Sequence, residues 1–201
     1  MIVFGSFLLI ISFLILNTTS LNTIDLAMIE WFSHQRTQQL NEISIVLSYL
    51  GGIPFVLFLM AFWCIYARLF KQYKQTTFIW VGILGSFSLA WILKFLISRP
   101  RPPENYHLVD VLGSSFPSGH AAYATALGCL AIYVYSQSKK YRIILFFSII
   151  WMVVMGISRV YLGVHYPSDV LAGWGTSLIY ISIIYLIFIK LDSTRKFIVL
   201  D

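Results

Sequence analysis

Two histidines and one aspartate lie in short polar stretches of a largely apolar chain. His165 precedes Asp169 by four residues in the stretch "VHYPSD", and Pro167 between them is suited to the first turn of a helix. At about one helical turn of separation, the Asp169 carboxylate can reach the His165 ring. A carboxylate on one ring nitrogen fixes the tautomer and makes the other nitrogen a better nucleophile. The pair predicts nucleophilic catalysis, and the alternative is a helix-capping aspartate beside an interfacial histidine.

The stretch "PSGH", residues 117–120, stands where another helix is expected to begin. Pro117 suits a first helical turn, because the N–H that it lacks would have no partner there. The N–H groups of Ser118, Gly119 and His120 are then free donors, and together they form an anion site. Gly119 also lets a ligand approach the backbone closely. The stretch predicts an anion site with a histidine beside it, and the alternative is a capped helix with an incidental histidine.

Positive charges gather near the same end of the predicted helices. Lys94 lies near the end of an apolar segment, and Arg99 and Arg101 follow in the proline-rich stretch "SRPRPP". Because prolines fix φ and remove backbone donors, this stretch is predicted to be stiff and non-helical, so that it can hold guanidinium groups in place. Arginine forks match phosphate oxygens in a bidentate way, while lysine adds a point charge. We expect Arg99 to line the entrance and Arg159 to join the pocket. For Lys94 alone, the alternative is snorkelling to the lipid headgroups.

These clusters together predict a cationic pocket with two imidazoles and one carboxylate. Such a pocket suits a phosphate dianion and repels a divalent metal, and the chain has neither an HExxH motif nor a cluster of carboxylates. We therefore expect phosphoryl transfer with no metal and no cofactor. Cys64 and Cys129 have no CxxC spacing, so they are predicted to be packing residues rather than a zinc site or a disulfide.

The elements that carry these residues are predicted to be transmembrane helices. Of the 201 residues, 59% are hydrophobic and 11% are charged, which is typical of an integral membrane protein. A spanning helix needs roughly 20 mostly apolar residues. Because the first apolar segment lacks a basic n-region and a clear cleavage site, we interpret it as a retained helix rather than a signal peptide. The expected fold is all-α, a single domain over residues 1–201. It has six transmembrane helices, at about 2–17, 46–69, 76–97, 118–136, 143–158 and 169–190.

The basic residues predict how this bundle sits in the membrane. Nine of them follow the second, fourth and sixth apolar segments, and the positive-inside rule makes that side cytoplasmic. The pocket then faces outward from a cytoplasmic membrane. The net charge of +6 reflects this topology, so it does not indicate nucleic-acid binding. The nine residues are Arg68, Lys71, Lys74, Lys139, Lys140, Arg142, Lys190, Arg195 and Lys196.

Residues 18–45 are expected on the outer side, between the first two membrane helices. They carry Asp25, Glu30 and Glu42 against Arg36 alone, and apolar residues such as Trp31 interleave with polar ones. This pattern predicts an interfacial helix that lies along the membrane surface, and the alternative is an ordinary surface loop.

Three spaced motifs make the chain resemble the type 2 phosphatidic acid phosphatase superfamily. The first motif is Lys94, six residues and then Arg101-Pro102; the second is Pro117-Ser118-Gly119-His120. The third is Ser158-Arg159, five residues, His165, three residues and Asp169. The motifs span residues 94–169, and three motifs in this order are far more specific than any one of them.

The resemblance implies a role for each site residue. His165 attacks phosphorus and forms a phosphohistidine, with Asp169 orienting its ring. His120 acts as a general acid on the leaving oxygen and then as a base for water. The remaining residues hold the phosphoryl oxygens, whose charge must be stabilised in the transition state. They are Lys94, Arg101, Ser118, Gly119 and Arg159.

The predicted function is a lipid phosphatase whose partners are a lipid phosphate and the bilayer. By analogy with small bacterial family members, undecaprenyl pyrophosphate is the first candidate substrate, followed by phosphatidylglycerophosphate and phosphatidic acid. A lipid phosphotransferase needs the same phosphohistidine and stays open, and a lipid-phosphate-binding membrane protein is the non-enzyme alternative. A haloperoxidase is disfavoured, because an intramembrane site suits a lipid headgroup better than halide and peroxide. Outside the motifs, His34 is expected in a loop and His107 is a candidate for the pocket. No oligomeric state is predicted.

Overall fold

The protein is a bundle of helices, and its computed structural model describes residues 1–191, with the side chains of residues 20, 21 and 191 left aside. No strand occurs in this part of the chain, so the predicted all-α class is confirmed. The helices are α1 (Ile2–Asn17), α2 (Thr19–His34), α3 (Gln38–Leu50), α4 (Ile53–Leu69), α5 (Tyr73–Ile97), the short 3-10 helix η1 (Glu104–Tyr106), α6 (Gly119–Val134), α7 (Tyr141–Tyr161) and α8 (Pro167–Leu191).

Several of these helices are long and apolar enough to cross a membrane, which makes the chain a multi-pass membrane protein. Helices α5, α7 and α8 meet this condition singly among the described residues. The pair α1 and α2, bent by 98°, and the pair α3 and α4, bent by 53°, meet it only when each pair is taken together. Helix α6 is apolar but has only 16 residues. The six predicted spans therefore stay a prediction.

The second predicted span is wrong in one respect, because the chain breaks inside it. Residues 46–50 form the end of α3, and α4 begins at Ile53. Gly51 lies at the break, where a Cβ would come within 2.5 Å of Met155 Sδ and 3.0 Å of His120 Cδ2. The α3–α4 junction therefore packs closely against the Met155 side chain of α7 and the His120 ring.

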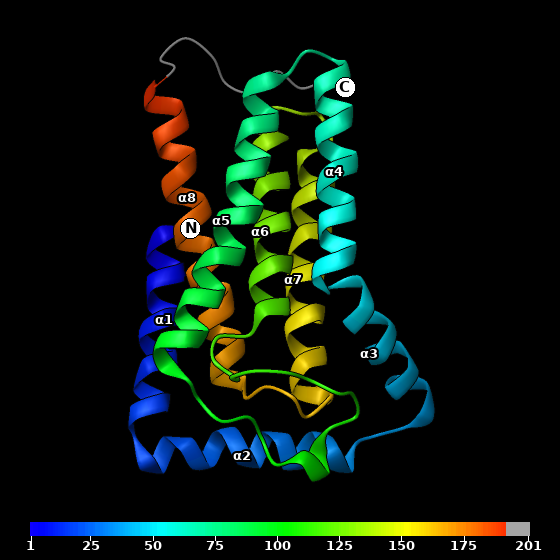
Figure 1. Ribbon diagram of the computed structural model, residues 1–201, viewed down its shortest axis with the longest axis vertical. Helices are drawn as coiled ribbons and strands as arrows, with labels where there is room; N and C mark the ends of the chain where they lie inside the picture. Colours follow the sequence, from blue (N-terminus) through cyan, green and yellow to red (C-terminus); the bar gives the residue numbers. More distant parts are fainter. Residues whose placement is uncertain (192–201) are drawn as a thin grey trace.

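Helix α6 forms the centre of the bundle, with α5, α7 and α8 around it (Figure 1). Small residues fill much of its sequence, GHAAYATALGCLAIYV, and 12 of its 16 residues are buried. Small side chains let neighbouring membrane helices approach closely. The start of α8 uses the same device, since a Cβ on Gly173 would lie 2.6 Å from the Ser118 carbonyl oxygen. This contact brings the first turn of α8 beside the first turn of α6. Cys64 and Cys129 are free and buried in the core, as predicted.

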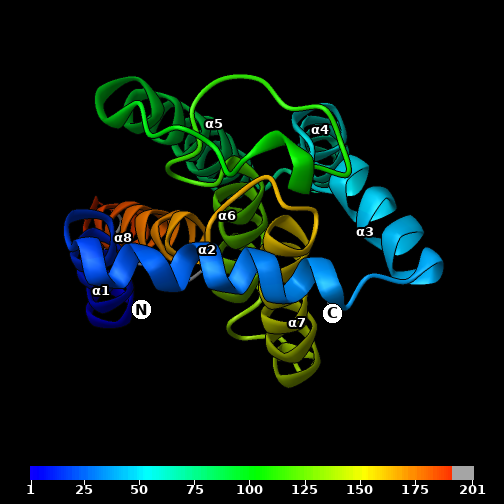
Figure 2. The ribbon, with the colours of Figure 1, turned by 90° about the horizontal axis from the view of Figure 1, so that it is seen from below.

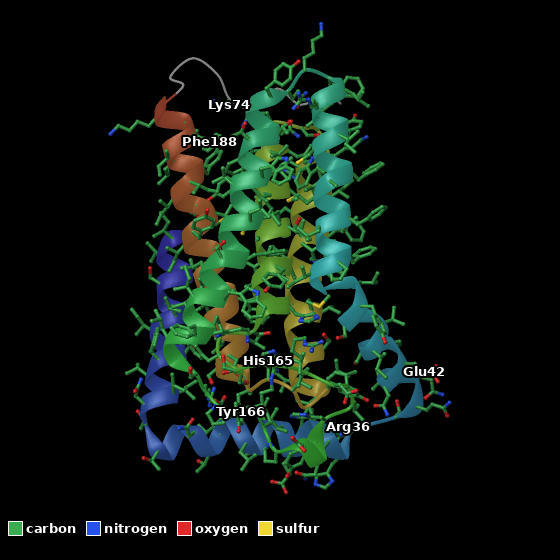
Figure 3. The ribbon with its side chains drawn as sticks, viewed as in Figure 1. Arg36, Glu42, Lys74, His165, Tyr166 and Phe188 are labelled. Carbon is green, nitrogen blue, oxygen red and sulfur yellow. The ribbon has the colours of Figure 1, made fainter. Side chains whose placement is uncertain are left out.

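The two ends of the bundle differ in charge and in structure. The α4–α5 and α6–α7 turns and the end of α8 lie together at one end, with Lys74 among them (Figures 1 and 3). This end carries seven of the nine basic residues used to predict topology; Arg195 and Lys196 lie outside the described residues. At the other end, α2 runs across the base of the bundle, and residues 98–118 and 162–166 lie along one side of it when the bundle is seen from below (Figure 2). Residues 19–34 thus form a helix, which was predicted, and not the alternative surface loop. The place of this helix in the membrane interface remains a prediction.

Candidate active site

His165 lies at the α2 end of the bundle, in the short link between α7 and α8 (Figure 3). Helix α8 begins at Pro167, as predicted, and this puts Asp169 in its first turn. Both side chains are almost completely buried, at 3% and 0% exposed. A carboxylate at this place also suits the positive end of the helix dipole.

The expected contact between His165 and Asp169 is present, and a hydroxyl lies next to it. His165 Nδ1 is 3.5 Å from Asp169 Oδ2. Ser115 Oγ lies 3.4 Å from the same nitrogen and donates a hydrogen bond to the same carboxylate oxygen. Since Nδ1 faces this polar group, Nε2 is the ring nitrogen that can attack a substrate. Ser115 was not predicted, because it lies outside the motifs and only the fold brings it to the carboxylate.

The surroundings of His165 keep its imidazole neutral. Burial lowers the pKa of His165 well below its usual value, and the positive charges of Arg101, Lys94 and Arg159 lower that pKa further. All three cations therefore lie close enough to act on one ring. A neutral imidazole is the form that can act as a nucleophile.

Two of these cations are held by backbone carbonyls of the 98–118 segment and the α7–α8 link. Lys94 Nζ donates to the Ser114 carbonyl over 2.6 Å. The Arg101 guanidinium donates to three carbonyls over 2.8–2.9 Å, and its Nη1 is 3.4 Å from His165 Nε2. The three acceptors are the carbonyls of Leu112, Gly113 and Val164. Carbonyls position these side chains without neutralising them.

Arg159 is the most deeply buried of the three, at 1% exposed. Its Nη1 donates to the Ser48 hydroxyl over 2.6 Å, and its Nε has no partner among the described residues. Within the described part of the chain, no carboxylate forms an ion pair with Arg159, Lys94 or Arg101. Buried or partly buried positive charge that has no directly paired carboxylate favours the binding of an anion.

His120 reaches this group through Ser48 of α3. The His120 Nε2 atom is 3.0 Å from the Ser48 carbonyl oxygen, so the same residue contacts both His120 and Arg159. The sequence contains no signal for Ser48, because it lies in an apolar stretch and reaches the site only through packing of α3 near α7.

The start of α6 differs in detail from the prediction. Ser118 is the N-cap, so that α6 begins at Gly119 and Pro117 precedes the helix instead of opening its first turn. A serine side chain is favoured at the N-cap because its oxygen accepts a bond from a free helix N–H, here that of Ala121. The Ser118 N–H was predicted to be a free donor, but it donates to the Asp169 carbonyl over 2.9 Å. The N–H groups of Gly119 and His120 remain as candidate donors to an anion.

Three residues outside the motifs also differ from expectation. Arg99 does not line an entrance: it is 8% exposed and forms ion pairs with Asp25 at 2.8 Å and with Asp169 at 2.6 Å. His34 is the last residue of α2 and not a loop residue. His107 Nε2 lies 2.9 Å from the carbonyl of the motif residue Pro102, and among the described residues His107 forms no bond with the side chain of a predicted site residue.

Metal binding has no structural support in the described residues, where no group of three or more His, Cys, Asp or Glu side chains could hold an ion. The expected independence from metal is a statement about the reaction, and it stays a prediction.

Comparison with known proteins places this site in a family. The model of the PAP2 superfamily matches residues 75–192. Phosphatidylglycerophosphatase B of Bacillus subtilis is 34% identical over 155 residues, which cover 72% of this chain and 73% of that protein. Undecaprenyl-diphosphatase of Sulfolobus acidocaldarius is 33% identical over 121 residues, and lipid A 1-phosphatase of Rhizobium etli is 31% identical over 116. The chain spans about half the length of these last two proteins, at 56% and 46%.

A solved structure agrees over nearly the whole chain. The crystal structure of the first transmembrane PAP2 type phosphatidylglycerolphosphate phosphatase from Bacillus subtilis matches with a TM-score of 0.86 and 25% identity, over 95% of this chain and 98% of that one. Fold and site thus define a helical, membrane-embedded hydrolase of the lipid phosphatase class. Within that class, the chain belongs to the PAP2 superfamily.

Proposed function

We propose that the chain hydrolyses a lipid phosphate or pyrophosphate through a phosphohistidine, with no metal. The observation that carries this proposal is the set of three cations without a carboxylate partner, Lys94, Arg101 and Arg159, around His165. These cations, with the Ser118 side chain and the Gly119 N–H, hold the non-bridging oxygens of the phosphoryl group.

In the first step, His165 Nε2 attacks phosphorus on the side opposite the leaving oxygen. The N–P bond forms as the bond from phosphorus to the leaving oxygen breaks, and that oxygen takes a proton from His120. Asp169 orients the His165 ring and stabilises the positive charge that develops on it. The product of this step is the dephosphorylated lipid, or the lipid monophosphate where the substrate is a pyrophosphate.

In the second step, water replaces the histidine on phosphorus. His120, now neutral, takes a proton from the water as its oxygen attacks phosphorus. The N–P bond breaks, its electron pair returns to His165 Nε2, and inorganic phosphate leaves. Both histidines are then in their starting protonation states.

The membrane arrangement that we propose has six spanning helices, α1 and α4 to α8, in a cytoplasmic membrane. The basic residues at one end support a cytoplasmic location for that end. The site then opens on the outer side, where α2 lies along the interface.

The substrate that we propose first is undecaprenyl pyrophosphate. Phosphatidylglycerophosphate is the second candidate, because phosphatidylglycerophosphatase B of Bacillus subtilis matches 72% of this chain, and the solved structure that matches 95% of it is of a phosphatidylglycerolphosphate phosphatase. A hydrocarbon chain is supported by an apolar groove of about 860 Å³ between α4, α6 and α7, and its lining includes Leu50, two residues from Ser48 in the sequence. Phe62, Ala131 and Phe147 are among its lining residues.

Release of inorganic phosphate by the purified protein tests the proposal. Undecaprenyl pyrophosphate, phosphatidylglycerophosphate and phosphatidic acid are supplied in detergent, each with and without a second lipid as acceptor, and the His165→Ala variant is the control. We expect phosphate release that needs no acceptor and is lost in the variant. Phosphate transfer only to the acceptor indicates a phosphotransferase, and binding without release indicates a non-catalytic protein.

A further inference from the structure

Arg99 joins two buried carboxylates that lie on different helices. Its Nη1 donates to Asp169 Oδ1 over 2.6 Å, and its Nη2 donates to Asp25 Oδ2 of α2 over 2.8 Å. Asp25 and Asp169 are 1% and 0% exposed. The Tyr166 ring lies 4.1 Å from the guanidinium carbon, so one face of the guanidinium is covered as well.

Ser168 completes the link between α2 and α8. Its N–H donates to Asp25 Oδ1 over 3.1 Å, its hydroxyl donates to Asp25 Oδ2, and its oxygen accepts a bond from Arg99 Nη1 over 2.8 Å. The carboxylate from α2 therefore binds the first turn of α8 directly beside Asp169.

We propose that Arg99 is a positioning residue for the hydrolysis, which holds Asp169 for His165 and is itself held by Asp25 of α2. This inference rests on the proposed function, because it assigns Arg99 a part in the same reaction. It concerns residues outside the three motifs, and it makes α2 a part of the active site.

The division of bonds at Asp169 supports this role. Asp169 Oδ1 binds Arg99. Asp169 Oδ2 receives the Ser115 hydroxyl and the Tyr166 N–H and faces His165 Nδ1. Without the Arg99 guanidinium, Oδ1 has no charged partner, and the carboxylate can rotate about its Cβ–Cγ bond. Oδ2 then no longer stays directed at the histidine.

The charges around Arg99 argue against a role in phosphate binding. Two carboxylates already surround its single positive charge, and a phosphate dianion would meet both of them. Lys94, Arg101 and Arg159 differ, because no ion pair with a carboxylate is found for them in the described structure. Arg99 thus belongs to the support of the nucleophile, while the other three belong to the anion site.

Arg99→Lys and Asp25→Asn test this role, because each keeps a side chain of about the same size. The first removes the planar fork that contacts both carboxylates, and the second removes the negative charge that holds Arg99. Lysine is a point charge and cannot hold two carboxylates with a planar fork. The probe is dioleoyl phosphatidic acid in detergent micelles. We measure kcat, KM, the vanadate inhibition constant and the rate of phosphoenzyme formation in rapid-quench experiments. Vanadate binding counts the folded sites, so that all rates are expressed per site.

We expect Arg99→Lys to slow phosphoenzyme formation by about 10–100-fold, since small misplacements of a reacting group cost up to about 10²-fold. KM and the vanadate constant should stay within about threefold, because Arg99 does not touch the phosphate. Asp25→Asn should slow the same step by about 3–10-fold, since the bond from Arg99 to Asp169 remains. The matched control is Arg142→Lys, an exposed arginine in the first turn of α7, which should behave as the wild type.

The double variant Arg99→Gln with Asp25→Asn separates positioning from folding. It removes both charges of the pair, so we expect the number of vanadate-binding sites to recover while the rate per site stays low. A raised KM and a weaker vanadate constant at an unchanged rate would show that Arg99 binds phosphate, and would overturn the proposal. Fewer sites at an unchanged rate per site would overturn it as well. If the wild type and Arg142→Lys release no phosphate from phosphatidic acid, undecaprenyl pyrophosphate or phosphatidylglycerophosphate, the proposed function fails together with this role.

Discussion

Replacing Arg159 by methionine should make the protein more stable and inactive. Arg159 is 1% exposed, its Nη1 bonds to the Ser48 hydroxyl, its Nε is unpaired, and it has no carboxylate partner in the described structure. The folded protein without substrate therefore carries a buried charge that is poorly compensated. Methionine is similarly long and unbranched, and it can fill the same space without a charge.

The size of this effect follows from two opposing contributions. Burying an ion costs an effective several kcal/mol, and a hydrogen bond to a charged group returns about 1.5–3 kcal/mol. Substitution of buried charges by hydrophobic residues is often stabilising by about 1–4 kcal/mol, and we expect Arg159→Met to lie in this range. In the reaction that we propose, the same substitution removes a guanidinium fork that can bind two phosphoryl oxygens. A loss of two charge-assisted bonds, about 3–6 kcal/mol, corresponds to about 10²–10⁴-fold in kcat/KM.

Thermal unfolding of the purified proteins in detergent, with and without vanadate, measures both contributions. Without vanadate, the unfolding temperature should be higher for Arg159→Met than for the wild type. Vanadate should raise the unfolding temperature of the wild type but not that of the variant, because only the wild type binds the oxyanion. Arg142→Met, at an exposed position, should change stability by less than about 0.5 kcal/mol. A variant less stable than the wild type without vanadate would show that the Arg159 charge is compensated, and would refute the reasoning.

Further predictions concern the two histidines, the oxyanion and the topology. His120→Ala should slow alkyl phosphomonoesters by about 10²–10⁴-fold but pyrophosphates less, whereas His165→Ala should lose all substrates and form no acid-labile phosphoenzyme. An equal dependence on leaving group in both variants contradicts these roles. Because the pKa of His165 is lowered, its ring should stay neutral in ¹⁵N NMR as the pH falls through about 6.5. The unfolded chain binds more protons there, so stability should fall with pH below that value; a His165 that titrates near 6.5 contradicts the assignment. Vanadate should inhibit, and a chelator should not; activity lost to chelator and restored by magnesium would refute a metal-free reaction. In intact cells Asn105→Cys should be labelled and Lys139→Cys protected, against a wild type whose two cysteines are buried, and the reverse result inverts the topology.

The motif residues could be predicted because their spacing depends on local structure. Pro167 starts a helix and Asp169 falls in its first turn, whatever packs around them. The same holds for the polar cap before α6, although Ser118 rather than Pro117 defines its start. Errors of one residue at a helix end are expected, since capping depends on bonds that only the folded chain supplies.

The supporting residues could not be predicted, because tertiary packing alone brings them to the site. Ser48 lies 111 residues from Arg159, and Ser115 lies 54 residues from Asp169. Ser48 stands in an apolar run and Ser115 stands just before the PSGH motif, but neither stretch indicates which distant residue its serine contacts. The break at Gly51 was missed for a different reason: Gly51-Gly52 and Pro54 are a helix-breaking signal, but the apolar residues on both sides were interpreted as one continuous span.

Arg99 and Arg101 show most clearly where sequence reasoning ends. The two residues flank one proline, and both look equally suited to a phosphate. In the structure, Ser98 ends α5 with a φ of +47°, in the left-handed region, and the chain then directs Arg99 between two carboxylates and Arg101 toward loop carbonyls. What separates their roles is the counter-ion and not the residue type. An arginine that already has its carboxylates supports the fold and the nucleophile, and an arginine without them is free to bind an anion. This criterion assigns Arg101 and Arg159 to the phosphate and Arg99 to Asp169, and the two sets of variants described above test each half of it separately.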